Sequence, residues 1–451
     1  MAVGLLAPLL AAMLAVVPAM IAPVFAHAVG VNDGVVSGGS AEPLPEALTL
    51  DLALKLSRDD HPAMAIAAAE RMAADADVDL AAAAWGWDSY LEFDARAADK
   101  VAVESRDLRD DSRATFYLSR LLTDFGGSNA AVEAAEARLA GADLALDYRA
   151  ELGRIEVMQR YLDVRLADLR YFVDDEDMTL TFLRYDRLRE RRERFGQFAE
   201  VEERELESIF RGRLAARTAA GHRQRSARNR LALAMGRPGE LAVSVLEPDL
   251  SVYEREAPEY EQIVDEVLER HPLVRLNRIL VDAAERRIRA RELAARPELR
   301  AGFEATRWSL ETGNRDELVA GLKLRVPIGG KSLQNARIAE AEAGRHRRLA
   351  DARMLEYELR QEVLELVQRL QQLDVEAEAA RVNELYRDLY LDRSRTLYQL
   401  EARADLGDSQ ARQAEAVWRT ARIHYERALT WARIDAMRGR PLAILNPEET
   451  R

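Results

Sequence analysis

The chain has 451 residues, a formal net charge of −13 and no cysteine. Its acidity excludes general nucleic-acid binding, which needs a basic face, and the lack of cysteine excludes disulfides, thiolate metal sites and cysteine nucleophiles. Charged residues make up 32% of the chain, while glycine (23) and proline (14) are sparse, a composition typical of long helices and coiled coils.

The N-terminus carries a nearly unbroken apolar run from Leu5 to Phe25, followed by Ala26-His27-Ala28. This small-x-small pattern predicts a secretory signal peptide over residues 1–28, with cleavage after Ala28 or, alternatively, after Ala26. A single membrane anchor is the competing interpretation, which the prolines of the run disfavour. No other uncharged stretch approaches the roughly 20 residues that a membrane-spanning helix needs. A linker is expected over residues 29–47.

Residues 48–238 form the first predicted repeat. A helix is expected from Leu48 to Ala84, and alternation of side chains then predicts two strands separated by a charged stretch. A long helical region follows and closes at Gly236-Arg237-Pro238. The expected strands cover Trp87 to Arg96 and Ala114 to Phe125, and the long helical region covers Ser128 to Met235.

A linker over residues 239–258 leads to the second predicted repeat, 259–442, and a tail over residues 443–451. The repeat has the same order of elements and closes at Gly439-Arg440-Pro441. Its expected elements are a helix from Tyr260 to Ala295, strands around Leu299 to Thr306 and Leu318 to Val326, and a long helical region from Lys331 to Met437.

Three landmarks recur in the same order. Gly126-Gly127 and Gly329-Gly330 are 203 residues apart, and so are the two Gly-Arg-Pro closures; the pairs His61-Pro62 and His271-Pro272 are 210 apart. The sequence therefore predicts an internal tandem duplication of helix, two strands and long helix pair.

The long helices carry a near-heptad apolar seam, which predicts lateral helix packing. In the second repeat this seam comprises Leu355, Leu359, Val363, Leu366, Leu370 and Leu373. Each first arm, from Ser128 to about Glu193 or from Lys331 to about Leu397, would be roughly 100 Å long at 1.5 Å per residue. The chain is expected to turn back near Gly196 and between Tyr398 and Asp408.

Four amphipathic strands between long helices need a partner for their edges. One solution is a closed barrel shared among subunits, with apolar side chains toward lipid and charged ones toward a water-filled lumen. The strand lengths of about 9–11 residues suit a tilted membrane strand. The alternative is a small soluble sheet packed on the helices.

The sequence resembles the TolC-like outer-membrane efflux proteins over nearly the whole mature chain. The best local match is Leu324-Arg325-Val326-Pro327-Ile328-Gly329-Gly330-Lys331, which is similar to the family's Pro-x-x-Gly-Gly element but has one residue between Pro327 and the glycines. The segment from Leu48 to Pro62 resembles the opening helix of the family, and the Gly-Arg-Pro endings resemble its repeat closures.

The resemblance implies a mainly α fold and a homotrimer, with twelve strands in one β-barrel and twelve helices in a coiled-coil-like tunnel. It further implies an outer-membrane location with a periplasmic helical domain, and partners in a periplasmic adaptor protein and an inner-membrane pump. The function implied is a passive duct of a tripartite efflux or type I secretion system, with no enzymatic activity. The rival interpretation is a soluble periplasmic coiled-coil scaffold or adaptor without a barrel.

Members of this family gate at the helical tips, often with acidic residues. The candidate tip residues here are Asp405, Asp408, Glu401 and Gly196. Glu401 stands where the family usually has Gly, and a solvated helix-tip turn is the competing interpretation of the acidic residues.

We find no sequence motif for a metal, a cofactor or a catalytic site. His61 and His271, each before a proline, are expected to be helix-breaking turn residues. The run Asp174-Asp175-Glu176-Asp177 lacks the spacing of a calcium loop and is expected to be an exposed acidic patch. An Arg-rich segment, 187–194, is expected to pair with Glu190, Glu193 and the acidic residues after Gly196, either within one subunit or across an interface. Docking of an adaptor is the competing interpretation of this segment. Two tryptophans, Trp85 and Trp87, suit either a membrane-interface belt or packing at the helix-to-strand junction.

Overall fold

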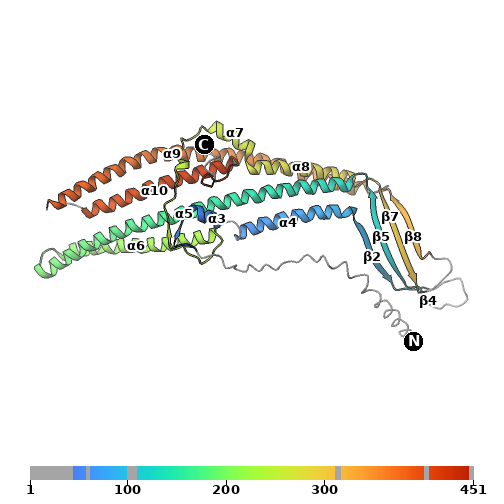
Figure 1. Ribbon diagram of the computed structural model, residues 1–451, viewed down its shortest axis with the longest axis horizontal. Coiled ribbons are helices and arrows are strands. Elements are labelled where there is room, and N and C mark those ends of the chain that lie inside the picture. The colour runs from blue at the N-terminus through green and yellow to red at the C-terminus, as the bar shows by residue number, and fades with distance from the viewer. Residues whose placement is uncertain (1–43, 57–60, 99–108, 310–315, 401–405, 446–451) are drawn as a thin grey trace, which may run out of the picture. The chain divides into compact units, whose positions relative to one another are not determined.

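The computed structural model describes residues 44–56, 61–98, 109–309, 316–400 and 406–445, so the predicted signal peptide lies outside the described residues. The unit described here is Pro45–Arg451 (Figure 1). Its α-helices are α3 (Leu50–Leu56), α4 (Pro62–Ala82), α5 (Gly127–Phe195), α6 (Glu200–Ala234), α7 (Tyr260–Arg270), α8 (Pro272–Leu293), α9 (Lys331–Gln399) and α10 (Leu406–Met437). Short 3₁₀ turns cover Ala83–Trp85 (η2) and Ser251–Tyr253 (η3).

The first helix of each repeat is divided at its His-Pro pair. His61 and His271 are thus the helix-breaking residues that the prolines after them predicted. Proline is tolerated at the first position of a helix but not inside one. His61 Nδ1 accepts the N–H of Ala63 at 3.2 Å at the start of α4, and His271 Nδ1 accepts that of Leu273 at 3.0 Å at the start of α8. The expected single helices 48–84 and 260–295 are therefore each two helices, α3 with α4 and α7 with α8.

The two long helices α5 and α9 have 69 residues each, which corresponds to about 100 Å. Each follows a glycine of positive φ, Gly126 at 100° and Gly330 at 84°, a conformation that costs a residue with Cβ more than glycine. The expected seam of α9 is confirmed, because Leu359, Val363 and Leu370 are at most 3% exposed.

The two Gly-Arg-Pro segments close their repeats with the same backbone geometry. Gly236 has φ of 74° and Gly439 has φ of 70°. The N–H of Arg237 reaches the carbonyl of Ala232 at 2.8 Å, and that of Arg440 reaches the carbonyl of Asp435 at 2.9 Å. This is the Schellman arrangement that ends a helix on glycine, and it supports the internal duplication.

The helices pack in the order α4, α5, α8, α9 near the sheet (Figure 1). Farther along, α5 contacts α6 and α10, and α10 contacts α9. Each repeat thus supplies one pair to the layer at the sheet end, and α5 against α8 joins the two pairs.

The segment between the repeats is more ordered than a plain linker. Strand β6 (Ser244–Val245) pairs in parallel with β1 (Ala47–Leu48). The buried Tyr161 of α5 lies beneath this ladder, with its hydroxyl 2.9 Å from Leu48 O and 2.7 Å from Leu246 O. A hydroxyl has one proton, so it donates to one of these carbonyls at a time.

The four predicted strands form one antiparallel sheet in the order β2, β5, β7, β8. The second and third strands each begin one residue before the predicted start. The register between them is regular except between Leu121 and Thr123. The strands are β2 (Trp87–Asp94), β5 (Arg113–Thr123), β7 (Glu298–Trp308) and β8 (Leu318–Arg325), and β3 (Ala97–Ala98) pairs with β4 (Arg109–Asp110) beyond the first hairpin.

Candidate functional site

The register of the sheet separates its side chains into two chemically different faces. Leu91 lies opposite Phe116, which lies opposite Ala305, which lies opposite Leu318. Because side chains alternate along a strand, the rest of this face follows from the pairing. This apolar face comprises Trp87, Ser89, Leu91, Phe93, Ala114, Phe116, Leu118, Arg120, Leu299, Ala301, Phe303, Ala305, Arg307, Leu318, Ala320, Leu322 and Leu324, with Arg120 and Arg307 as its charged members.

Large side chains of the apolar face are exposed in this chain. Phe93 is 59% exposed, Leu318 68% and Leu322 69%. A contiguous apolar surface of this kind marks an interaction with lipid or protein. The face therefore needs an apolar environment that the described part of the chain does not supply.

The opposite face of the sheet is polar. It carries Asp88, Glu92, Arg300, Glu304 and Lys323, together with the stacked rings of Tyr90 and Tyr117 at 4.7 Å. Glycines Gly302 and Gly321 lie opposite each other in the middle of this face. Such a surface suits contact with water.

Both outer strands of the sheet have an edge without a strand partner among the described residues. β2 pairs only with β5, and β8 pairs only with β7. Every residue of β8 is exposed. Unpaired edges are ready to add another strand, so the sheet is able to continue into a neighbouring sheet on both sides.

Trp87 begins β2 on the apolar face and is 62% exposed. The Arg120 guanidinium stacks on its ring at 5.4 Å and donates a hydrogen bond to Trp85 O at 3.3 Å. Trp87 is thus not buried at the helix-to-strand junction, and its place at a membrane interface stays a prediction.

At the far end of α5, the chain turns back at Gly196, whose φ is 62°. Arg192, in the last turn of α5, pairs with Glu203 of α6 at 2.8 Å, and the Glu202 carboxylate accepts the N–H of Ala199. Arg189 and Arg194 pair with Asp186 and Glu190 in their own helix. The expected ion pairing of the Arg-rich segment is confirmed within one chain.

At the second tip, the candidate residues Glu401 and Asp405 lie outside the described residues. Asp408, at the start of α10, forms a 2.7 Å ion pair with Arg184 of α5. Next to it, Gly407 is so close to Leu180 that an added Cβ would lie 2.2 Å from Leu180 Cδ1. Asp408 therefore joins the tips of the two repeats. No local sequence pattern points to Arg184 as the partner, because it lies 224 positions away from Asp408.

The acidic run of α5 is not the exposed patch that the sequence suggested. Asp174 is 5% exposed and pairs with Arg170 at 2.7 Å. Its neighbours Asp175 and Asp177 pair with Arg217 and Arg213 of α6. The acidic run is covered because α6 runs back along α5 and presents arginines to it. The two segments are too far apart in the sequence for local patterns to indicate this pairing.

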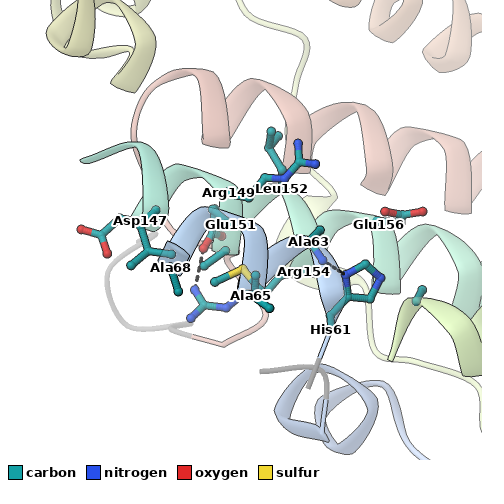
Figure 2. Close-up of a pocket in the computed structure, with 15 residues that line it drawn as sticks. His61, Ala63, Ala65, Ala68, Asp147, Arg149, Glu151, Leu152, Arg154 and Glu156 are labelled. Carbon is teal, nitrogen blue, oxygen red and sulfur yellow. Dashed lines mark hydrogen bonds and ion pairs between the residues drawn. The ribbon is translucent and has the colours of Figure 1, made fainter. Parts of the chain in front are cut away.

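A groove of about 740 Å³ lies between the start of α4 and residues 146–156 of α5 (Figure 2). His61 lies at one end, held by its bond to the Ala63 N–H, and Glu151 pairs with Arg154 inside it at 2.5 Å. The remaining lining includes four alanines and three charged residues, Asp147, Arg149 and Glu156. The ring of His61 caps a helix, and the carboxylate of Glu151 is paired with Arg154. Neither side chain is therefore available as a catalytic or metal-binding group in this groove.

Among the described residues, no group of three or more His, Cys, Asp or Glu side chains is placed to bind a metal ion. Within that same part of the chain, no helix is both long enough and apolar enough to cross a membrane.

No protein-family model and no curated protein sequence matches this chain. Solved structures that are similar to it include outer-membrane proteins of three bacteria. The Campylobacter jejuni CmeC outer membrane channel matches with a TM-score of 0.69 at 11% identity, over 89% of each chain. The outer membrane protein VceC of Vibrio cholerae matches at 0.67 and 15%, over 87% of this chain and 96% of that one. The Neisseria gonorrhoeae MtrE outer membrane channel matches at 0.67 and 16%, over 87% and 89%.

The fold is that of a TolC-like outer-membrane channel protomer. The match extends over nearly nine-tenths of this chain. The fold class expected from the sequence, mainly helical with an internal repeat and four strands, is confirmed.

Proposed function

We propose that three copies of this chain form a passive channel through an outer membrane. The observation that carries the proposal is the four-stranded sheet, which has an exposed apolar face, a polar face and two edges without a strand partner in the described part of the chain. Three such sheets joined edge to edge would form a closed twelve-stranded barrel and leave no edge in lipid. The apolar face would then contact lipid and the polar face the lumen.

The long helices extend the proposed pathway away from the membrane. At about 100 Å, α5 and α9 are long enough to cross an aqueous compartment rather than fill a globule. The fold shared with CmeC and MtrE, both described as outer membrane channels, supports this use of the helices. We place the helical part in the periplasm, reached through the predicted signal peptide at residues 1–28.

The channel would serve a tripartite efflux or type I secretion system, with a periplasmic adaptor and an inner-membrane pump as partners. Transport would draw its energy from the pump, so no reaction, metal or cofactor is assigned to this chain. We further propose that the tips form the periplasmic gate, with the Arg184–Asp408 pair and the turn at Gly196 as described elements. Glu401 and Asp405 remain candidates on the basis of sequence.

The test is conductance of the purified full chain in planar lipid bilayers, alongside a variant with Arg184→Ala and Asp408→Ala to loosen the tip. Discrete current steps, larger in the variant, are the expected result. Folded protein that inserts neither as wild type nor as variant would overturn the channel and favour the rival, a soluble periplasmic scaffold.

A further inference from the structure

Among the described elements, two helices at the sheet end have a helix neighbour on one side alone. α4 contacts α5, and α9 contacts α8, so α4 and α9 are the outer helices of the layer. The outer strands of the sheet, β2 and β8, are connected to these same two helices. Large apolar side chains are exposed on both helices: Ile66 at 62% and Leu80 at 73% on α4, and Leu333 at 57% on α9. These faces lack a partner among the described residues.

The contact between α5 and α8 is a template for what could cover them. There, Gly141 of α5 lies directly under Leu276 of α8, and an added Cβ would lie 3.1 Å from Leu276 Cδ1. Glu133 of α5 and Arg286 of α8 form a 3.9 Å ion pair on the same interface. The contact thus combines a glycine that admits an aliphatic side chain with opposite charges.

The duplication places the same elements on the two outer helices. The 203-residue spacing of the repeats relates Gly141 to Gly344 on α9, and the 210-residue spacing relates Leu276 to Ile66 on α4. In the part of the chain that the structure describes, a Cβ on Gly344 would meet nothing within 4 Å. The chain makes the contact between Gly141 and Leu276 within itself. Gly344 and Ile66 are the corresponding residues of the other two helices, and they could form a second contact of the same kind.

Charge supports this pairing. α5 over residues 127–153 has five acidic and two basic residues, and it faces α8, which has six basic and three acidic ones. α4 has four acidic residues and one basic one, whereas α9 over residues 331–353 has six basic and three acidic ones. A contact of α9 with α4 would again join a basic helix to an acidic one. In this contact the helix that carries the glycine is the basic one, whereas in the contact of α5 with α8 it is the acidic one.

We propose that Ile66 of one copy packs over Gly344 of the next copy, so that α9 docks on α4 as α5 docks on α8. The occupant of both exposed faces is a second copy of this chain. Because the two faces differ, the contact is head-to-tail and closes into a ring when the rotation permits. The inference rests on the proposed trimer and names the helix surface that holds it together.

Cysteine cross-linking tests the contact, since the chain has no cysteine of its own. The variant Ile66→Cys with Gly344→Cys is purified from outer membranes, treated with an oxidant or a short bismaleimide, and denatured by heat. A positive control, Gly141→Cys with Leu276→Cys, carries the template contact and links within one chain. A negative control joins Ile66→Cys with Tyr357→Cys, a residue of α9 that is 66% exposed.

The expected result is a covalent trimer after heating for the Ile66/Gly344 variant, at least about tenfold more abundant than for the negative control. The positive control should stay at the mass of one chain while showing intrachain linkage after proteolysis. A heat-sensitive wild-type trimer without Ile66–Gly344 linkage, in the presence of a working positive control, would overturn this contact and leave the channel standing. A wild-type chain that forms no trimer would overturn both.

Discussion

Arg184 of α5 and Asp408 of α10 are joined by a 2.7 Å ion pair although 224 positions separate them in the sequence. Beside the pair, Leu180 contacts Gly407, and the hydroxyls of Ser394 and Ser409 lie 2.8 Å apart in a buried position. The ion pair and the Leu180–Gly407 contact hold the start of α10 against α5 and so connect the tips of the two repeats, while the serine pair joins α9 to α10 within the second repeat.

Replacing Arg184 with alanine should loosen the tip. Both side chains are partly exposed, so the pair contributes little to global stability, and the melting temperature should stay nearly constant. Single-channel conductance in planar bilayers should rise instead. The matched control is Arg189→Ala, which removes a pair with Asp186 inside α5. Equal conductance of the Arg184 and Arg189 variants would argue against a gating role for the tip.

The variant Tyr161→Phe should destabilise the junction between the repeats. The Tyr161 hydroxyl is buried and is the donor shared by the carbonyls of Leu48 and Leu246; burial also raises the pKa of Tyr161 to about 12. Removing a buried donor costs about 1–3 kcal/mol. Thermal unfolding should show the loss, and Tyr357→Phe, at an exposed position, should show none. Indistinguishable melting curves would mean that water replaces the hydroxyl.

Acid should weaken the helical part through His271. Burial lowers the pKa of His271 from its ordinary 6.5 to about 4, so the folded chain keeps the ring neutral while the unfolded chain protonates it. Stability is therefore intact above pH 6.5 and is lost as the pH falls from 6.5 toward 4, by roughly 2–3 kcal/mol.

The variant His271→Asn isolates this effect, because asparagine can also cap a helix but does not titrate. Its unfolding free energy, measured in urea between pH 4 and 7, should fall less steeply with acid than that of the wild type. The same slope in both proteins would assign the acid sensitivity to other groups.

An arginine on the apolar face of the sheet should impair membrane assembly. Leu322 and its neighbour Gly321 point to opposite faces of β8. An arginine at the middle of a lipid-facing strand costs about 2–4 kcal/mol, so Leu322→Arg should lower the amount of trimer in the outer membrane. Gly321→Arg, which adds the same charge on the polar face, should be tolerated. The opposite order would mean that the faces are assigned the wrong way round.

The periodicity of apolar side chains and the positions of glycine and proline were sufficient to predict the main elements of the fold. Alternation in Trp87–Asp94 and Leu318–Arg325 identified strands within two residues of their ends, and glycines marked the helix ends because a positive φ favours them locally. The break at His61-Pro62 was visible as a proline, yet its consequence, two helices instead of one, needed the cap geometry.

Partnerships between distant segments could not be predicted in the same way. The acidic run at Asp174 looked exposed because its arginine partners stand some 40 to 50 positions later on α6. The pairing of Ala47–Leu48 with Ser244–Val245 joins two segments that looked like linkers. Of the candidate tip residues, Asp408 has an ion-pair partner and Gly196 forms the turn, while Glu401 and Asp405 lie outside the described residues.

Electrophoresis of the outer-membrane fraction, with and without heating, shows most directly whether three copies of the chain share one barrel. We expect the native chain to be found in that fraction and to migrate as a trimer unless heated, because closing three sheets into one barrel requires three copies. A chain found only as a soluble periplasmic monomer or dimer would rule out the shared barrel.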